Sequence, residues 1–457
     1  MRKSMWTVLG AAVALTVAPF AQADSSDNAQ LRAELDAMKA ELAQLKNEQG
    51  ETWMNEKRAE EVKALVHEAL SDADTRASLL QDGAMAGYDG KKFFLQSADG
   101  SFRLNIQGQI QFRYVFQRTR TDSQNSREEN QGFQLRRAKI KFNGHIGDPK
   151  VKFAISLAGA RGGSQDVDNG GVYVEEAKLS YDITDWLSVY GGRTKAPFMR
   201  EELVSSSRQL AVERSVVNEY FTWGWTEGVG VVIKPVETVK IDIMVNDGRE
   251  RGEGFSGTTL DYNDPSHVVS LTGRVEWLAI GDWSAVKGFN GWANDEVALL
   301  IGLAGGYSNG NGVGSSSLTS GTGVNLFSFT GDVSFKWKGL TAFAAGVGRI
   351  GTVDEPTGGS GEAYGAVAQV GYNISDTWEP FVRYEYLGYN HHAASASEDI
   401  HIVTGGLNWF IKKNAAKFTA DVVYIFEPLP FSESGLGLTS SSTGDQIAFR
   451  LQFQLLF

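Results

Sequence analysis

The stretch FRLNIQGQIQFRYVFQ, residues 102–117, alternates apolar and polar side chains along its length. Its apolar members are Phe102, Leu104, Ile106, Ile110, Phe112, Tyr114 and Phe116, and its polar members are Arg103, Asn105, Gln107, Gln109, Gln111, Arg113 and Gln117. Successive side chains of a strand point to opposite faces, so this pattern predicts a long strand with one apolar face. Strands usually run about 5–6 residues, whereas a strand that crosses a membrane needs about 9–11. The length and alternation therefore favour a membrane-spanning strand whose polar face is turned inward.

The same alternation recurs to the last residue. Candidate strands follow at about 131–146, 149–161, 172–183, 186–195, 225–236, 238–247, 267–278, 295–307, 324–337, 340–350, 362–373, 378–390, 399–411, 416–427 and 444–457. With the first strand they number about sixteen, an even number that suits a bacterial barrel made from one chain. The sequence thus predicts an all-β membrane protein, an antiparallel transmembrane β-barrel of about sixteen strands.

The connections between these strands alternate in length. Tight turns are expected at 143–149, 182–185, 338–340 and 373–377, and long polar loops at 117–130, 247–265, 308–323 and 393–399. Short turns on one rim and long loops on the other are typical of outer-membrane barrels. Tryptophans near strand ends are expected to form interfacial belts: Trp186, Trp225, Trp277, Trp337, Trp378 and Trp409. The free C-terminal Phe457 indicates a last strand that is recognised by the barrel assembly machinery.

Composition excludes several classes of protein. The chain has 457 residues, no cysteine and a formal net charge of −12. The absence of cysteine excludes disulfides and thiolate chemistry and suits export through an oxidising periplasm. The acidity argues against nucleic acid as a partner. No apolar run approaches the roughly 20 residues of a spanning helix.

The N-terminal region predicts export and a helical segment. Arg2 and Lys3 precede an apolar stretch, and Ala21-Gln22-Ala23 forms a cleavage site, so residues 1–23 are expected to be a signal peptide. A short membrane anchor is the alternative. Within 24–82 a heptad seam predicts a periplasmic coiled coil, with a solitary amphipathic helix as the alternative; its positions are Leu31, Leu35, Met38, Leu42 and Leu45. Residues 83–100 are expected to be a linker, and 101–457 the barrel.

Five stretches resemble the phosphate-selective porin O and P family. They are GFQLRRAKIKFNGHIGDPKVKFAI at 132–155, DWLSVYGGRTKAPFMREEL at 185–203, SSSRQLAVERSVV at 205–217, WEPFVRYEYLGYN at 378–390 and GLNWFIKKNAAKFTADVVY at 406–424. The resemblance runs in order through nearly all of 100–457. It implies a sixteen-stranded, trimeric outer-membrane channel, often with anion preference, and a short N-terminal segment in the periplasm. It also implies that the loop at about 196–222 folds inward and narrows the pore. The longer N-terminal segment departs from the family pattern.

Basic side chains on the inward face are candidates for contact with solute. Arg137, Lys139 and Lys141 share one face of their strand, and Lys150 and Lys152 continue the series on the next strand. Guanidinium groups offer five donors to a phosphate or carboxylate, and ammonium groups act as point charges. The full set of expected channel-lining and anion-binding residues is Arg103, Arg113, Arg137, Lys139, Lys141, Lys150, Lys152, Arg193, Lys195, Arg200, Arg208 and Arg214.

Two other interpretations of the polar residues remain open. The inward cations can instead form structural ion pairs with Glu176, Asp332, Glu385 or Asp421, which would give a weakly selective pore. His391, His392 and His401 lack the spacing of a metal site, and neither His67 nor His145 has an obvious catalytic partner. No catalytic residue, metal or cofactor is therefore expected.

The leading hypothesis is a passive diffusion channel in the outer membrane that prefers anions such as phosphate or small acidic solutes. Its expected partners are those solutes, membrane lipid and lipopolysaccharide, the assembly machinery through Phe457, and two further copies in a homotrimer. A second hypothesis is a structural barrel whose coiled coil tethers the outer membrane to the cell wall. A barrel enzyme is the weakest alternative.

Overall fold

The computed structural model describes residues 36–40, 63, 84–90, 92–120, 127–159, 172–248, 269–310, 324–353, 360–390, 397–429, 434–439 and 444–457. The chain divides into two compact units, Met1–Asp82 and Gly83–Phe457. In the first unit residues 36–40 and Lys63 are helical. The predicted signal peptide and the rest of the predicted coiled coil lie outside the described residues.

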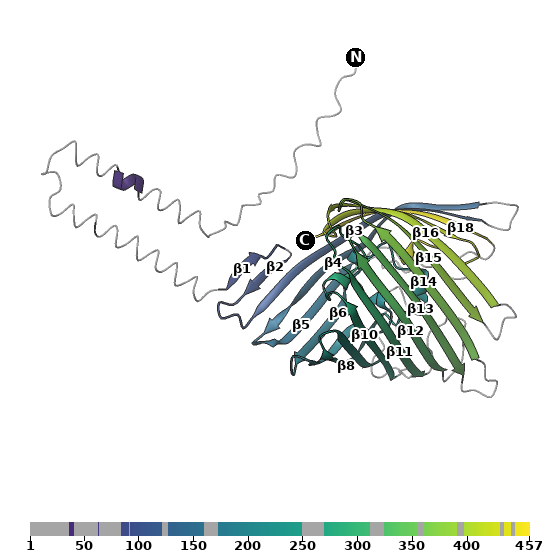
Figure 1. The fold of residues 1–457 in the computed structure, drawn as a ribbon, viewed down its shortest axis with the longest axis horizontal. Helices are drawn as coiled ribbons and strands as arrows, with labels where there is room; N and C mark the ends of the chain where they lie inside the picture. The colour runs from purple at the N-terminus through teal and green to yellow at the C-terminus, as the bar shows by residue number, and fades with distance from the viewer. Residues whose placement is uncertain are drawn as a thin grey trace, which may run out of the picture. The chain divides into compact units, whose positions relative to one another are not determined.

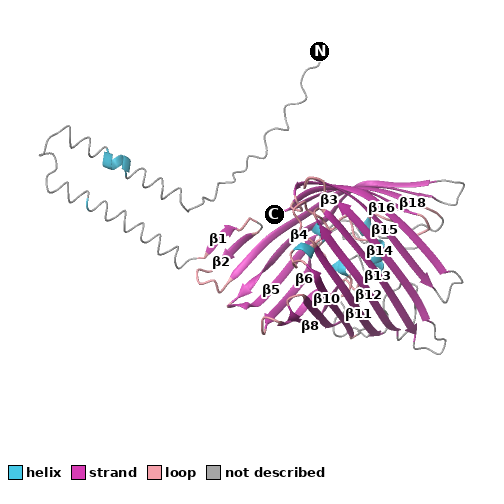
Figure 2. Cartoon of the chain, in the orientation of Figure 1, coloured by secondary structure: helices cyan, strands magenta, loops and turns pink. Residues whose placement is uncertain are grey.

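Sixteen strands among the described residues of the second unit form a closed antiparallel barrel (Figure 1). Each strand pairs with its neighbour in sequence, and β18 pairs with β3 to close the ring. The strands are β3 (Arg103–Arg120), β4 (Arg127–Ile146), β5 (Asp148–Gly159), β6 (Tyr173–Asp182), β7 (Leu187–Lys195), β8 (Trp225–Val236), β9 (Val239–Asn246), β10 (Ser270–Ile280), β11 (Ala298–Gly310), β12 (Val324–Trp337), β13 (Leu340–Val353), β14 (Ser360–Tyr372), β15 (Trp378–Asn390), β16 (Ser397–Lys412), β17 (Ala416–Ile425) and β18 (Gln446–Leu456). The predicted fold is confirmed (Figure 2).

The two faces of the wall differ as the alternation predicts. On the outer face Ile140 is 48% exposed and Phe133 is 73% exposed, which suits contact with lipid. On the inner face Gln109 and Arg113 are buried among other polar groups. Most strands exceed the roughly 9–11 residues needed to cross the membrane, so several extend beyond it.

A small hairpin completes the edge of the first barrel strand. β18 covers β3 only from Gln109 onward, and the terminal Phe457 continues the ladder by exchanging backbone hydrogen bonds with Gly108 at 2.6 and 3.1 Å. Beyond that point β2 (Phe93–Gln96) pairs with β3, and β1 (Met85–Tyr88) pairs with β2. These two strands lie in the segment that the sequence analysis treats as a linker. They satisfy backbone groups that would otherwise form an open sheet edge.

Tryptophans mark the rim that carries the tight turns. Five of them are between 40% and 52% exposed at the strand ends of this rim: Trp186, Trp277, Trp337, Trp378 and Trp409. An amphipathic indole at this depth suits the boundary between lipid and water. Trp225 also lies at a strand end, but it starts β8 at the opposite rim. Its half-buried ring lies 5.2 Å from the Lys195 ammonium.

One connection on the tight-turn rim is much longer than the others on that rim. Residues 281–297 join β10 to β11 and include the short helix η2 (Ala285–Lys287). The backbone N–H of Phe289 donates to the carbonyl of Arg208 at 3.0 Å, and Asn290 donates to the Glu379 carboxylate at 2.7 Å. Phe289 and Asn290 are both buried. This connection therefore enters the barrel instead of turning tightly outside it.

An apolar core lies inside the barrel, where polar side chains were predicted. Inward positions of β15 to β17 hold Leu387, Ile400, Ile402 and Ile425, all fully buried. They pack with apolar residues of an inward loop, including Phe221, and with Leu436 of the β17–β18 connection. Burial against these inserted segments replaces contact with water, so apolar residues are favoured there. Among the described residues no helix is long and apolar enough to cross a membrane.

Candidate pore constriction

The segment between β7 and β8 folds into the barrel. Its helices are α3 (Arg200–Leu203), η1 (Ser206–Arg208) and α4 (Val216–Phe221). Ser206 accepts a hydrogen bond from Gln109 of β3 at 3.0 Å. At the other end the backbone N–H of Val216 donates to Glu385 of β15 at 2.6 Å. The predicted inward fold is thus confirmed, and the loop spans the lumen from one wall to another.

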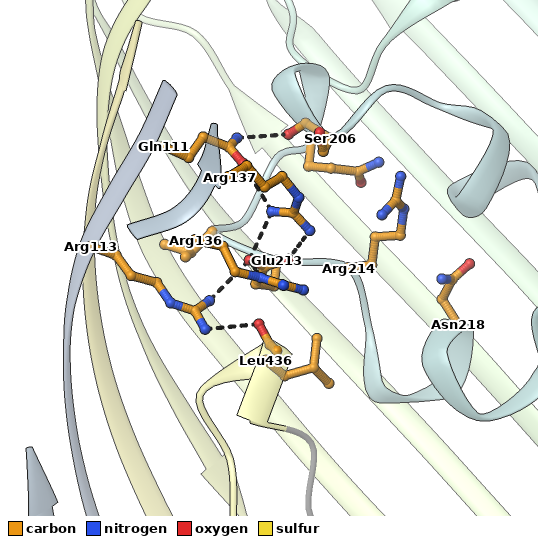
Figure 3. A network of polar contacts seen from close by, with 12 residues as sticks. Gln111, Arg113, Arg136, Arg137, Ser206, Glu213, Arg214, Asn218 and Leu436 are labelled. Atoms are coloured by element: carbon orange, nitrogen blue, oxygen red, sulfur yellow. Dashed lines mark hydrogen bonds and ion pairs between the residues drawn. The ribbon is translucent and has the colours of Figure 1, made fainter. Parts of the chain in front are cut away.

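The loop and the β3–β4 wall meet at a cluster of three arginines around one carboxylate (Figure 3). Arg113, Arg136 and Arg137 each donate to Glu213 Oε1 at 2.9 Å. Arg137 also donates to Glu213 Oε2 at 2.8 Å, which makes its contact bidentate. The Glu213 side chain is 2% exposed. Charge-assisted bonds of this kind are short and strong because both partners are ionised.

A β-bulge explains why two consecutive residues reach the same carboxylate. Gln111 pairs with Arg137 and Phe112 pairs with Leu135, so Arg136 is the extra residue of β4. A bulge re-aims a side chain that simple alternation would place on the other face. The sequence analysis therefore missed Arg136. The adjacent Arg-Arg pair in a predicted strand was the available signal.

Glu213 remains ionised in this cluster. Burial opposes its ionisation, but the charges of Arg136, Arg137 and Arg113 hold its pKa well below the ordinary glutamate value. Removing one partner of such a buried pair typically costs about 3–5 kcal/mol, because the remaining charge loses its compensation. The cluster therefore fixes this end of the inward loop to the wall.

A second carboxylate holds the start of the loop. Glu202 lies 2.7 Å from the Lys195 ammonium and 3.2 Å from Arg214. Burial opposes its ionisation, whereas Arg214 and Lys195 lower the pKa of Glu202 to about 2. Glu201, one residue earlier, accepts from the Ser215 backbone N–H at 2.8 Å. Lys195 and Arg214, both predicted to contact solute, therefore hold the loop together.

Further predicted cations lie beside carboxylates. Arg103 lies 3.2 Å from Asp89, Arg193 lies 3.7 Å from Glu227, and Arg200 lies 3.5 Å from Glu276. Two more ion pairs join Lys139 to Glu175 and Lys152 to Asp182. Most of the basic residues predicted to line the channel therefore pair with acidic residues.

Three predicted cations differ from the rest. In the part of the chain that the structure describes, Lys141, Lys150 and Arg208 have no ion pair. Lys141 is half-buried on the inner face of β4, Arg208 is exposed on the inward loop, and Lys150 is exposed beside the β4–β5 turn. Lys141 on the inner wall and Arg208 on the inward loop are thus the predicted cations nearest the cluster that have no ion pair among the described residues.

Three of the four carboxylates considered for structural ion pairs across the lumen do form ion pairs, but each partner is an arginine of the same strand or of a nearby strand. Asp332 pairs with Arg274 at 2.7 Å, Glu385 with Arg383 at 2.8 Å, and Asp421 with Arg450 at 2.7 Å. Glu175, rather than Glu176, receives the Lys139 ammonium. A register shift between Ser156 and Leu157 of β5 inserts the extra residue in β6 and turns Glu175 inward.

The β17–β18 connection also reaches the cluster. Arg113 donates to the carbonyl of Gly435 at 2.8 Å, and Arg450 donates to the carbonyl of Leu436 at 2.8 Å. Both carbonyls belong to η3 (Ser434–Leu436). Arginines of the first and last barrel strands therefore bind a second inserted segment beside the inward loop.

The histidines considered for catalysis do not form a site among the described residues. His401 lies on the outer face, 2.7 Å from the Tyr384 hydroxyl, while His391, His392 and His67 lie outside the described residues. His145 contacts the carbonyl of Gly100 at 2.8 Å. In the described ranges no group of three or more histidine or acidic side chains could hold a metal ion.

Residues 105–274 match the family model described as phosphate-selective porin O and P. The predicted resemblance is confirmed over this segment. Together with the closed barrel, the match makes the protein an outer-membrane channel. The segment contains β3 to β9, the inward loop and the arginine cluster, so the match covers the constriction itself.

Solved structures share the fold at low sequence identity. An OmpT variant with loop L8 deleted, from Vibrio cholerae, is 13% identical; the similarity covers 78% of this chain and 100% of that one, with a TM-score of 0.51. An anion-selective porin from Comamonas acidovorans is 12% identical over 78% and 99% of the two chains, with a TM-score of 0.50. The outer-membrane channel DcaP of Acinetobacter baumannii is 11% identical over 81% and 100%, with a TM-score of 0.50. The comparison with curated protein sequences found no match.

Proposed function

We propose that the protein is a passive diffusion channel that prefers anions such as phosphate or small acidic solutes. The observation that carries this proposal is the charge of the arginine cluster. Three guanidinium groups surround one carboxylate, so the contact between loop and wall retains two positive charges, 3 − 1 = 2. The Arg136 side chain is 16% exposed and keeps part of this charge accessible from the lumen.

Two unpaired cations support the same proposal. Lys141 follows the cluster along β4, and Arg208 lies on the inward loop beside the 281–297 connection. A pore selects ions by the charges at its narrowest part. These two side chains therefore replace the longer predicted series as the proposed solute-contacting residues. The anion-selective porin of Comamonas acidovorans has the same fold, which is in keeping with this preference.

A weakly selective general porin is the second candidate. It is favoured by the carboxylates that compensate Lys139, Arg193, Lys195 and Arg200. If these pairs cancel most of the field in the lumen, size alone would govern passage. The two candidates differ in the sign and size of the reversal potential across a salt gradient.

The test compares the wild type with the double variant Lys141→Gln, Arg208→Gln in planar bilayers across a KCl gradient. We expect wild-type anion selectivity and a fall of roughly twofold or more in the anion-to-cation permeability ratio of the variant, because two lumen charges are lost. Lys150→Gln is the matched control, since Lys150 is also unpaired but lies at the turn. A cation-selective wild type, or equal ratios in wild type and double variant, would reject the proposal.

The remaining predicted partners belong to this proposal as well. We infer a homotrimer, contact with lipid and lipopolysaccharide, recognition of Phe457 during assembly, and a periplasmic segment over 24–82. No nucleic acid, enzymatic activity or cofactor is part of the proposal. Deleting 24–82 tests the tethering alternative: loss of attachment to the cell wall with conductance intact would favour it.

A further inference from the structure

Glu213 has the hydrogen-bond environment of a bound anion. One of its carboxylate oxygens accepts a hydrogen bond from each of three guanidinium groups. The other oxygen accepts a second hydrogen bond from Arg137. Guanidinium groups arranged in this way bind planar carboxylates, with one bidentate contact fixing the orientation. The chain itself supplies the anion in the native protein.

Two of the three arginines are also positioned by partners other than Glu213. Arg113 donates to Gln134 at 2.7 Å and to the Gly435 carbonyl at 2.8 Å. Arg137 donates to Gln111 at 2.9 Å. Both arginines also lie on paired strands of the wall. The arrangement of these two arginines therefore does not depend on the carboxylate alone.

The loop around Glu213 has its own anchors. The backbone N–H of Val212 donates to Asp421 at 2.9 Å, and Arg214 is held by Glu202 at 3.2 Å. Val216 is bound through its N–H to Glu385. Loss of the Glu213 carboxylate would thus remove the anion from the pocket while the neighbouring residues remain attached to other parts of the barrel.

We propose that Arg113, Arg136 and Arg137 form an anion-binding site for a small carboxylate, and that Glu213 occupies this site and excludes solute from it. A tethered group competes at an effective concentration of about millimolar or above, so free carboxylates are outcompeted in the native pore. This inference goes beyond the proposed function, because it states that Glu213 of the chain itself occupies the arginine cluster. Contact with solute is then left to other cations.

Chemical rescue of Glu213→Ala by acetate is the decisive experiment. Truncation to alanine leaves two buried cations and one half-buried cation, Arg136, and makes space for a small carboxylate. In chloride we expect an apparent Tm at least about 5 °C below that of the wild type, since a buried charge partner is lost. Replacing chloride by acetate at equal ionic strength should raise the Tm of the variant most of the way to the wild-type value. It should leave the wild-type Tm unchanged.

Glu213→Gln is the matched control. Its amide fills the same volume without the charge, so we expect a lower Tm that acetate does not restore. Equal acetate responses of Glu213→Ala and Glu213→Gln, or no response of either, would overturn the proposal. If Glu213→Ala does not refold in chloride, the refolding yield in acetate becomes the measurement, and failure in both salts also overturns it.

Ion selectivity gives a second measurement. In chloride, Glu213→Ala should have an anion-to-cation permeability ratio several-fold above the wild type, because the cluster carries three uncompensated charges instead of two. Acetate should reduce this gain by occupying the site. A wild type without anion preference would reject the proposed function only, whereas absence of acetate rescue would reject only the inference about Glu213.

Discussion

The inward loop is held at its two ends by different physical interactions. At the β3–β4 wall Glu213 binds three arginines through charge-assisted hydrogen bonds. At the β13–β15 wall α4 buries Val217 and Phe221 completely in an apolar core. Ionic contacts depend on protonation and fix geometry, whereas apolar burial contributes stability that depends little on pH. The comparison indicates that the apolar end anchors the loop and the charged end sets its position beside the pore.

The largest expected effect comes from the apolar end. Phe221→Ala removes a fully buried aromatic side chain and leaves a cavity, which typically costs about 3–5 kcal/mol. We expect a lower thermal stability in detergent and a larger single-channel conductance, because the loop loses its anchor. Phe133→Ala, on the lipid-facing surface, is the control and should leave conductance unchanged. Unchanged stability and conductance in Phe221→Ala would contradict the assigned role of this end.

A polar contact between the two ends should have a smaller effect. Asp421 binds Arg450 and accepts from the Val212 backbone N–H at 2.9 Å. Asp421→Asn weakens hydrogen bonds to a charged group, which are worth about 1.5–3 kcal/mol. We expect a moderate loss in thermal unfolding measurements. Asp148→Asn at an exposed turn should show little change, and an equal loss in both variants would contradict this ranking.

Acid should weaken the ionic contacts of the loop and spare its apolar end. The pKa of Glu213 in the folded protein lies below its ordinary value of 4.5, so its stabilisation is complete above that pH and is lost as pH falls toward the depressed value. Burial raises the pKa of Glu201, which gives the opposite dependence for that group. We expect wild-type stability to change little between pH 7 and pH 5 and to fall in stronger acid. A Glu213→Gln variant should lack the part of this fall that belongs to Glu213, whereas the part that belongs to Glu202, whose pKa is lowered to about 2, should remain.

The smallest effect should come from an exposed ion pair on the outer face. Arg118 and Glu129 lie 3.3 Å apart, and their side chains are 41% and 52% exposed. Solvent screening limits such pairs to about 0–1 kcal/mol. Glu129→Gln should therefore leave thermal unfolding and conductance nearly unchanged. A loss of thermal stability as large as that of Asp421→Asn would show that the exposure of an ion pair does not determine its contribution to stability.

The sequence predicted the parts of this barrel that depend on local alternation. Period-two patterning placed Ile140 outside and Arg137, Lys139 and Lys141 inside, because neighbouring side chains of a strand must point to opposite faces. It failed where one extra residue changed the register, at Arg136 and at Glu175. A bulge depends on the pairing of two strands, which a single strand's pattern does not contain.

Contacts between distant segments were also beyond the sequence pattern. Leu387 and Ile400 break the expected polar lining because α4 and the β17–β18 connection cover them. The carboxylates that compensate Lys195 and Arg214 come from the loop itself, and their partners depend on its folded path. The sequence therefore placed Arg137, Lys139 and Lys141 on the inner face, but it could not rank the basic residues by accessibility.

The seam at β3 has a consequence for the order of events during biogenesis. This strand is synthesised first among the barrel strands, yet its partners in the ring are β18 and Phe457. Ring closure must therefore wait until β18 has been translocated. Until then β2 alone can pair with a short part of the free edge of β3. A chain truncated by a few residues at its C-terminus would leave this junction open in the membrane.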